Sequence, residues 1–108
     1  MSPNPVLQGT LDLLVLKVLS RSALHGYGIA VQIKSISQDE LRVEEGSLYP
    51  ALHRMEQSGW LASEWRPAEN GRKARYYRIT ASGRRKLAEQ EERWTRVSRA
   101  VGRVLRTA

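Results

Sequence analysis

The chain of 108 residues contains no cysteine, which excludes disulfide bridges, cysteine-ligated zinc and a thiol nucleophile. It also lacks a long hydrophobic run, because the apolar stretch Leu13–Leu16 ends at Lys17, well short of the roughly 20 residues that span a bilayer. The N-terminus shows no basic segment followed by an apolar block and a cleavage site, which a secretion signal would require. These absences predict a cytoplasmic protein that does not bind membranes.

The motifs of catalysis and of metal binding are missing as well. There is no Ser/His/acid arrangement, no glycine-rich phosphate loop and no pair of facing carboxylates. The two histidines, His25 and His53, fall on different expected elements and lack the spacing of metal ligands. We therefore expect neither an enzyme nor a protein that holds a metal or another cofactor.

Positive charge is concentrated in the second part of the chain. Residues 1–65 contain five Lys and Arg against seven Asp and Glu, whereas residues 66–108 contain thirteen against four. Fourteen of the 18 basic residues are arginine, whose planar guanidinium suits phosphates and the edges of bases. The asymmetry indicates a polyanionic partner, although charge alone is equally compatible with a solvated basic surface.

Hydrophobic spacing predicts helices over residues 7–21 and from residue 29 to about residue 37, with a tight turn between them at residues 24–28. A brief extended segment is expected around Leu41 and Val43. Alternation predicts strands over residues 61–66 and 75–79, joined by a turn at Asn70-Gly71. On this pattern Tyr77 belongs to the core and Tyr76 faces DNA or solvent.

A third helix is expected to begin near Gly46 or Ser47, because Pro50 is tolerated in a first turn, and to stop at Gly59. Helical geometry divides it into two faces. One face is apolar and holds Leu48, Ala51, Leu52 and Met55. The other holds side chains suited to base edges and phosphates, namely Tyr49, Pro50, His53, Arg54 and Gln57, with Ser47 at its start.

The hairpin tip brings together three cations on a short loop, Arg72, Lys73 and Arg75, which favours contact with phosphates or the minor groove. At the start of the second helix, Tyr27 is placed where free backbone N–H groups would meet a phosphate. A core position for Tyr27 fits the pattern equally well. For the third helix, the alternative is that Tyr49 packs under the hairpin and Arg54 pairs with a nearby acid.

A long last helix is expected over residues 81–106, with Thr80 as its N-cap. Its apolar residues follow the spacing of a short coiled-coil seam, which predicts dimerisation through Leu87, Trp94, Val97, Val101 and Val104. Trp94 packs between two copies of the helix in this interpretation. Alternatively, two Trp94 side chains flank an apolar pocket for an effector.

The expected fold is mainly α-helical with a small β-hairpin. It consists of a winged helix-turn-helix DNA-binding domain over residues 6–80 and a C-terminal dimerisation helix over residues 81–108. In such a fold the third helix enters the major groove of DNA and the hairpin, or wing, reaches the adjacent backbone.

Several segments together resemble the PadR family of bacterial transcriptional regulators. They are Leu11–Leu16 with Leu24–Gly28, Ser47–Glu56 with Gly59, and Gly71-Arg72 followed by Tyr76–Thr80 and Gly83. The resemblance implies a homodimer, usually a repressor of an inverted-repeat operator, that in some members responds to a lipophilic or aromatic compound. It implies that Tyr49, Pro50 and Arg54, and Arg72 and Lys73 in the wing, face DNA.

The leading hypothesis is therefore a dimeric repressor that binds double-stranded DNA with sequence specificity. The competing hypothesis is a winged-helix module that uses the same surface to bind an acidic protein. In that case affinity for duplex DNA would be weak and independent of sequence.

Overall fold

The computed structural model describes residues 6–107. Within these residues four helices and three strands follow one another, so the fold is mainly helical with a small antiparallel sheet, as predicted. The elements are α1 (Val6–Leu19), β1 (Leu24–His25), α2 (Gly26–Ile36), α3 (Glu45–Gln57), β2 (Leu61–Pro67), β3 (Lys73–Ile79) and α4 (Ala81–Arg106).

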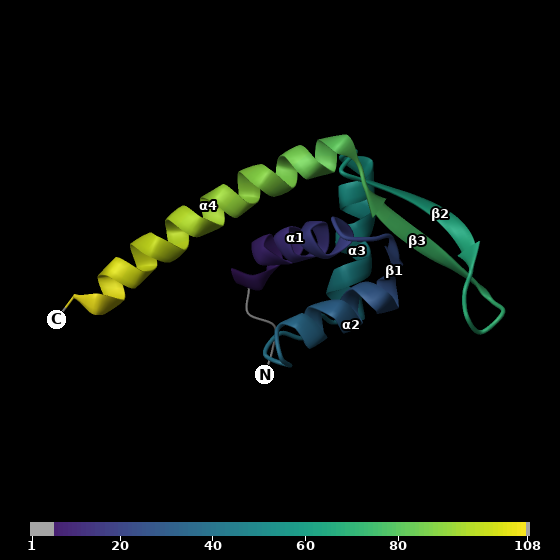
Figure 1. Cartoon of the computed structure of the whole chain (residues 1–108), viewed down its shortest axis with the longest axis horizontal. Coiled ribbons are helices and arrows are strands. Elements are labelled where there is room, and N and C mark those ends of the chain that lie inside the picture. The colour runs from purple at the N-terminus through teal and green to yellow at the C-terminus, as the bar shows by residue number, and fades with distance from the viewer. Residues whose placement is uncertain (1–5, 108) are drawn as a thin grey trace.

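Helix α1 lies at the centre of the body and contacts α2, α3 and α4. Its residues Val15 and Leu16 are completely buried, which confirms its expected place in the core. The helices α2 and α3 pack against it, while α4 runs over it and continues beyond the body on the side opposite to the wing (Figure 1). None of the helices in residues 6–107 is both long and apolar enough to cross a membrane.

The sheet has one strand more than the sequence predicts. Strand β1 pairs with β3 through Leu24↔Tyr77 and His25↔Tyr76, which gives the order β1-β3-β2. The segment expected to be only a tight turn thus also ties the start of α2 to the wing. A two-residue strand carries no alternation of its own, because pairing with a distant strand is what defines it.

Some boundaries also differ from the prediction. Helix α1 ends at Leu19, two residues early, and α2 begins at Gly26. Residues Leu41 and Val43 form no strand; both instead pack against the core from the segment between α2 and α3. Helix α3 starts at Glu45, so Pro50 lies beyond its first turn.

Local signals for the C-terminal end of α3 and the start of α4 are confirmed. Gly59 has a φ of 82°, and the backbone N–H groups of Gly59 and Trp60 donate to the carbonyls of Glu56 and Met55. This left-handed arrangement ends a helix and favours glycine. Thr80 Oγ1 accepts a hydrogen bond of 3.0 Å from the backbone N–H of Gly83 and donates one of 2.6 Å to the Gly59 carbonyl. The cap of α4 therefore also holds it against the end of α3.

Candidate nucleic-acid interface

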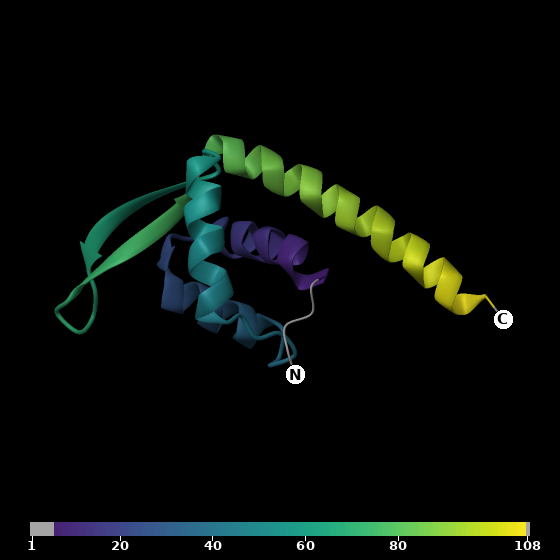
Figure 2. The same ribbon diagram turned by 180° about the vertical axis from the view of Figure 1, so that it is seen from behind.

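The outer face of α3 is uncovered. Figure 2 shows α3 in front of α1, with the wing projecting beside it. The four residues of its apolar face, Leu48, Ala51, Leu52 and Met55, are buried as predicted. The residues expected on the opposite face are exposed, namely Tyr49, Pro50, His53, Arg54 and Gln57, and Ser47 is half-buried.

Tyr49 lies against the first residue of α2 and lines the cleft that it shares with the wing. A Cβ atom at Gly26 would stand only 2.7 Å from the Tyr49 ring, so only glycine allows this close approach. The contact holds one end of the outer face of α3 against the start of α2. Gly26 is therefore a packing requirement of the site as well as a helix start.

The start of α2 is capped from within the sheet. His25 Nδ1 accepts a hydrogen bond of 2.9 Å from the backbone N–H of Gly28, and the His25 ring meets Tyr76 edge to face. Tyr27 follows the cap and is 67% exposed. Its side chain thus lies at the surface. The alternative of a core position for Tyr27 is therefore wrong, and a contact of Tyr27 with phosphate stays a prediction.

Between α2, α3 and the wing lies a cleft of about 510 Å³. Aromatic rings and cations share its walls, and none of the described residues that line it carries a carboxylate. Trp65 contributes a ring that is 62% exposed. The lining residues that carry the argument are Tyr27, Tyr49, Trp65, Arg72, Lys73 and Arg75.

The wing tip is shaped by the expected turn. Gly71 has a φ of 81°, and Asn70 Oδ1 accepts a hydrogen bond of 3.0 Å from the backbone N–H of Arg72. Across residues 6–107, the side chains of Arg72 and Lys73 enter no ion pair. Their charges are available to a partner at the mouth of the cleft.

Arg54 is committed to an internal partner. Its Nη1 and Nη2 donate hydrogen bonds of 2.9 and 2.7 Å to the two carboxylate oxygens of Asp12, which is buried on α1. The hydrogen bond with Asp12 raises the pKa of Arg54 above its ordinary value, against an opposing effect of desolvation. The Arg54 side chain is still 55% exposed, so it lies at the α3 surface while pairing with α1.

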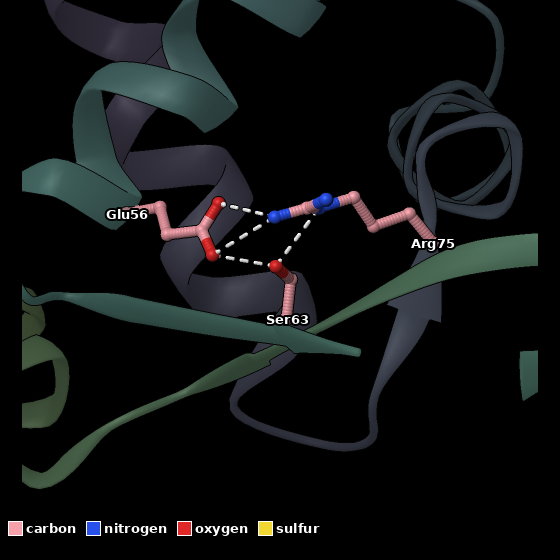
Figure 3. Close-up of polar contacts among 3 residues, drawn as sticks. All are labelled: Glu56, Ser63 and Arg75. Atoms are coloured by element: carbon pink, nitrogen blue, oxygen red, sulfur yellow. Dashed lines mark hydrogen bonds and ion pairs between the residues drawn. The ribbon is translucent and has the colours of Figure 1, made fainter. Parts of the chain in front are cut away.

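Arg75 is committed in a similar way. It donates to Ser63 Oγ at 2.9 Å and lies 3.4 Å from the carboxylate of Glu56 at the end of α3 (Figure 3). Beside it, Tyr77 is buried as predicted. Desolvation raises the Tyr77 pKa, and the nearby Arg75 cation partly offsets that rise. Two of the expected DNA-binding arginines therefore have acidic partners inside the protein.

The alternative in which Arg54 pairs with a nearby acid is confirmed, whereas the sequence interpretation overlooks Glu56 as the partner of Arg75 and the exposed Trp65. Alternation places Trp65 on the same sheet face as buried Leu61, a position that by itself predicts a core side chain. The predicted alternation of β2 is correct. The hairpin of β2 and β3 extends beyond the core, however, so the face that carries Leu61 and Trp65 lines the cleft at the position of Trp65. A tryptophan far from the root of a hairpin is the signal for such an aromatic wall.

Helix α4 divides into a packed and an unpacked part. Leu87, expected in the dimerisation seam, is only 7% exposed and belongs to the core of its own chain. This prediction is wrong because the first two turns of α4 pack over α1 and the wing root. Beyond them, Trp94, Val97, Val101 and Val104 remain exposed along one side of the helix, followed by Leu105.

Comparison with known proteins decides the family. The model of the "Transcriptional regulator PadR-like family" matches residues 15–89, which is more than half of the chain. The chain belongs to the PadR-like family of transcriptional regulators. The transcriptional regulator Rv3488 of Mycobacterium tuberculosis is 41% identical to it over 68 residues, 63% of each protein. An uncharacterised protein of Lysinibacillus sphaericus is 26% identical and is covered to 90%.

Solved structures of regulators share this winged-helix architecture with its C-terminal helix. A PadR family regulator from Eggerthella lenta is 37% identical and superimposes with a TM-score of 0.78, covering 95% of this chain and 88% of that one. A transcriptional regulator from Clostridium thermocellum superimposes with a TM-score of 0.84 at 26% identity, covering 93% and 97% of the two chains. The resemblance seen in the sequence motifs is therefore confirmed.

Proposed function

We propose that this regulator is a dimeric repressor that binds an inverted-repeat DNA operator through the outer face of α3 and the wing. The observation that carries the proposal is the uncovered α3 face beside a cleft that has cations and aromatic rings but no carboxylate among its described lining residues. A surface of this charge and shape suits the sugar–phosphate backbone of a duplex.

Within this surface, we assign His53 and Gln57 to base edges, because both are exposed on α3 and neither enters an ion pair within residues 6–107. Ser47, Tyr49, Pro50 and Arg54 complete the α3 face. Tyr27, Arg72 and Lys73 are assigned to the backbone, because they surround the mouth of the cleft. Arg54 contacts DNA only from within its pair with Asp12.

Dimerisation is proposed through the unpacked part of α4. The side chains of Trp94, Val97, Val101 and Val104 repeat at intervals of three and four residues on one side of the helix. A second copy of α4 would cover this row. Two-fold symmetry would then present two α3 helices to successive major grooves, about 34 Å apart.

Trp94 also motivates a second role, in which a small lipophilic or aromatic effector relieves repression. Trp94 is 49% exposed in the single chain, and two such residues across a dimer would form apolar walls. A Trp94→Ala variant that loses ligand-induced quenching would support this role, since Trp60 and Trp65 contribute the remaining fluorescence.

Selection of bound duplexes from a random pool by the purified protein tests the central proposal. We expect enrichment of an inverted repeat. A single half-site would contradict the dimer, and the absence of any enriched sequence would favour the protein-binding alternative. An acidic partner protein would then be expected to compete with duplex DNA irrespective of its sequence.

A further inference from the structure

Three polar side chains meet where the wing leaves the body (Figure 3). Glu56 comes from the last turn of α3, Ser63 from β2 and Arg75 from β3. Ser63 Oγ donates a hydrogen bond of 2.5 Å to Glu56 Oε2 and accepts one of 2.9 Å from Arg75 Nε. Arg75 Nη2 lies 3.4 Å from both Glu56 carboxylate oxygens.

The strand register explains why these residues come together. Ser63 pairs with Tyr77 and Trp65 pairs with Arg75, so Ser63 and Arg75 are diagonal neighbours on one face of the ribbon. That face looks toward α3, whose Glu56 is half-buried. The contact thus joins three elements by side chains rather than by backbone pairing.

The hydroxyl of Ser63 has a single hydrogen, which it gives to the Glu56 carboxylate, and a lone pair that receives Arg75. Both bonds involve an ionised group, which makes them stronger than neutral hydrogen bonds. Arg75 also lies 5.8 Å from the centre of the Trp65 ring. The positive charge of Arg75 is therefore opposed within the protein and its position is defined from two sides.

The wing beyond this point has little support from the core. Glu64 and Trp65 on β2, and Lys73 and Arg75 on β3, are exposed, whereas Leu61 and Ile79 at the root are buried. A two-stranded ribbon is weakly stable by itself and can change its twist. The angle between wing and α3 therefore depends on contacts at the root.

We propose that Glu56, Ser63 and Arg75 form a strut that sets the angle of the wing relative to α3, and that Arg75 is a positioning residue rather than a phosphate ligand. This inference rests on the proposed function, because the angle matters when α3 and the wing bind one duplex together. Glu56 acts on DNA binding through Arg75 and Ser63 and touches no DNA itself.

Glu56→Gln tests the strut by the sign of its effect. Removing a carboxylate from a DNA-binding surface reduces repulsion and by itself tightens binding. Loss of the strut instead weakens DNA binding, because a lost charge-assisted hydrogen bond corresponds to about a tenfold higher dissociation constant. We expect this weakening in fluorescence anisotropy titrations of the selected operator. Glu69→Gln at the wing tip is the matched control and should bind slightly more tightly, since Glu69 makes no ion pair within residues 6–107.

Arg75→Lys separates positioning from phosphate contact. Lysine keeps the charge that a phosphate needs but lacks separate nitrogens for Ser63 and Glu56. We expect Arg75→Lys to bind as weakly as Glu56→Gln, and the double variant to be no weaker than either one. On an operator shortened to the base pairs that α3 contacts, all three variants should bind with the affinity of the wild type, because the wing then has no DNA to contact.

Residual dipolar couplings of the free protein provide a readout that does not need DNA. In the wild type, the couplings of the backbone amides in residues 64–76 and in α3 should fit one common alignment tensor. In Glu56→Gln, the couplings of residues 64–76 should become smaller. If the wild type binds no duplex, the proposed function fails and the couplings alone decide the strut. Unchanged couplings, or tighter binding by Glu56→Gln together with wild-type binding by Arg75→Lys, would overturn it.

Discussion

At the residue scale, carboxylates from distant segments decide what the arginines do. Asp12 on α1 holds Arg54 through two hydrogen bonds, and Glu56 holds Arg75 with the help of Ser63. A count of charges along the sequence treats all arginines as equally available to a nucleic acid, because it contains no information on which of them pair with carboxylates in the fold. Within residues 6–107, the wing-tip cations Arg72 and Lys73 enter no ion pair, which suits the role of phosphate ligand that we propose for them.

Replacing each of two glycines of α4 with alanine should change the free energy of unfolding in opposite directions. A Cβ at Gly83 would stand 2.1 Å from the Trp60 carbonyl oxygen, which is backbone and cannot move aside. We expect Gly83→Ala to lower the free energy of unfolding by about 2 kcal/mol or more. At Gly102 the nearest atom is the end of the flexible Arg106 side chain, so Gly102→Ala should stabilise by about 0.5–1 kcal/mol.

Urea denaturation followed by circular dichroism measures both variants under the same conditions. Equal effects of the two substitutions would mean that helix propensity alone matters in α4. The close approach of α4 to Trp60 would then have no energetic importance.

At the scale of elements, the C-terminal end of α3 and the turn of the wing follow from local chemistry. Gly59 and Gly71 supply the positive φ angles, and Asn70 supports the turn through its side chain. These features need only neighbouring residues, which is why the sequence predicts them. The wing angle is different, since it depends on the contact between Glu56, Ser63 and Arg75.

The wing tip should contribute affinity without sequence preference. We expect Lys73→Ala to weaken binding to operator and random duplexes by similar factors and to reduce the slope of log K against log salt by about one unit. Titrations at several salt concentrations measure the slope. Lys34→Ala is the control, because Lys34 lies in the last turn of α2, at the end away from the cleft, and its loss should leave the slope unchanged.

At the scale of the whole molecule, α4 gives the chain an elongated form of 58 × 32 × 21 Å. Its first part completes the core through Leu87, and Lys17 on α1 lies 3.3 Å from Glu91. Its second part continues beyond the rest of the described residues 6–107 and is mostly exposed (Figure 1). The protein therefore presents its α3 surface and its exposed apolar row in separate regions, so the proposed DNA binding would not compete with the proposed dimerisation.

Val101→Glu should separate the protomers. Placing a carboxylate in the middle of an apolar seam carries a desolvation cost without a partner, so we expect the dimer dissociation constant to rise by about a hundredfold or more. Sedimentation equilibrium at micromolar concentration measures this change. Arg99→Glu alters the charge further, but on the other side of the helix, and should leave the mass unchanged. A wild type that sediments as a monomer would contradict the seam itself.

Taken by itself, the sequence determined the features that depend on periodicity and on local chemistry. The apolar faces of α1 and α3, the stop at Gly59, the turn at Asn70-Gly71 and the cap at Thr80 all agree with the structure. In each case the residues involved are neighbours along the chain or lie on one face of a helix. The resemblance to the PadR family is carried by the same local motifs.

Only the tertiary structure decided the features that join distant residues. Strand β1 exists because Leu24 and His25 pair with β3, and Leu87 is core because α4 packs over α1. Arg54 and Arg75 have partners 42 and 19 residues away. The physical reason is that hydrogen bonds and ion pairs require contact in space, and no spacing rule within one element encodes a contact between two.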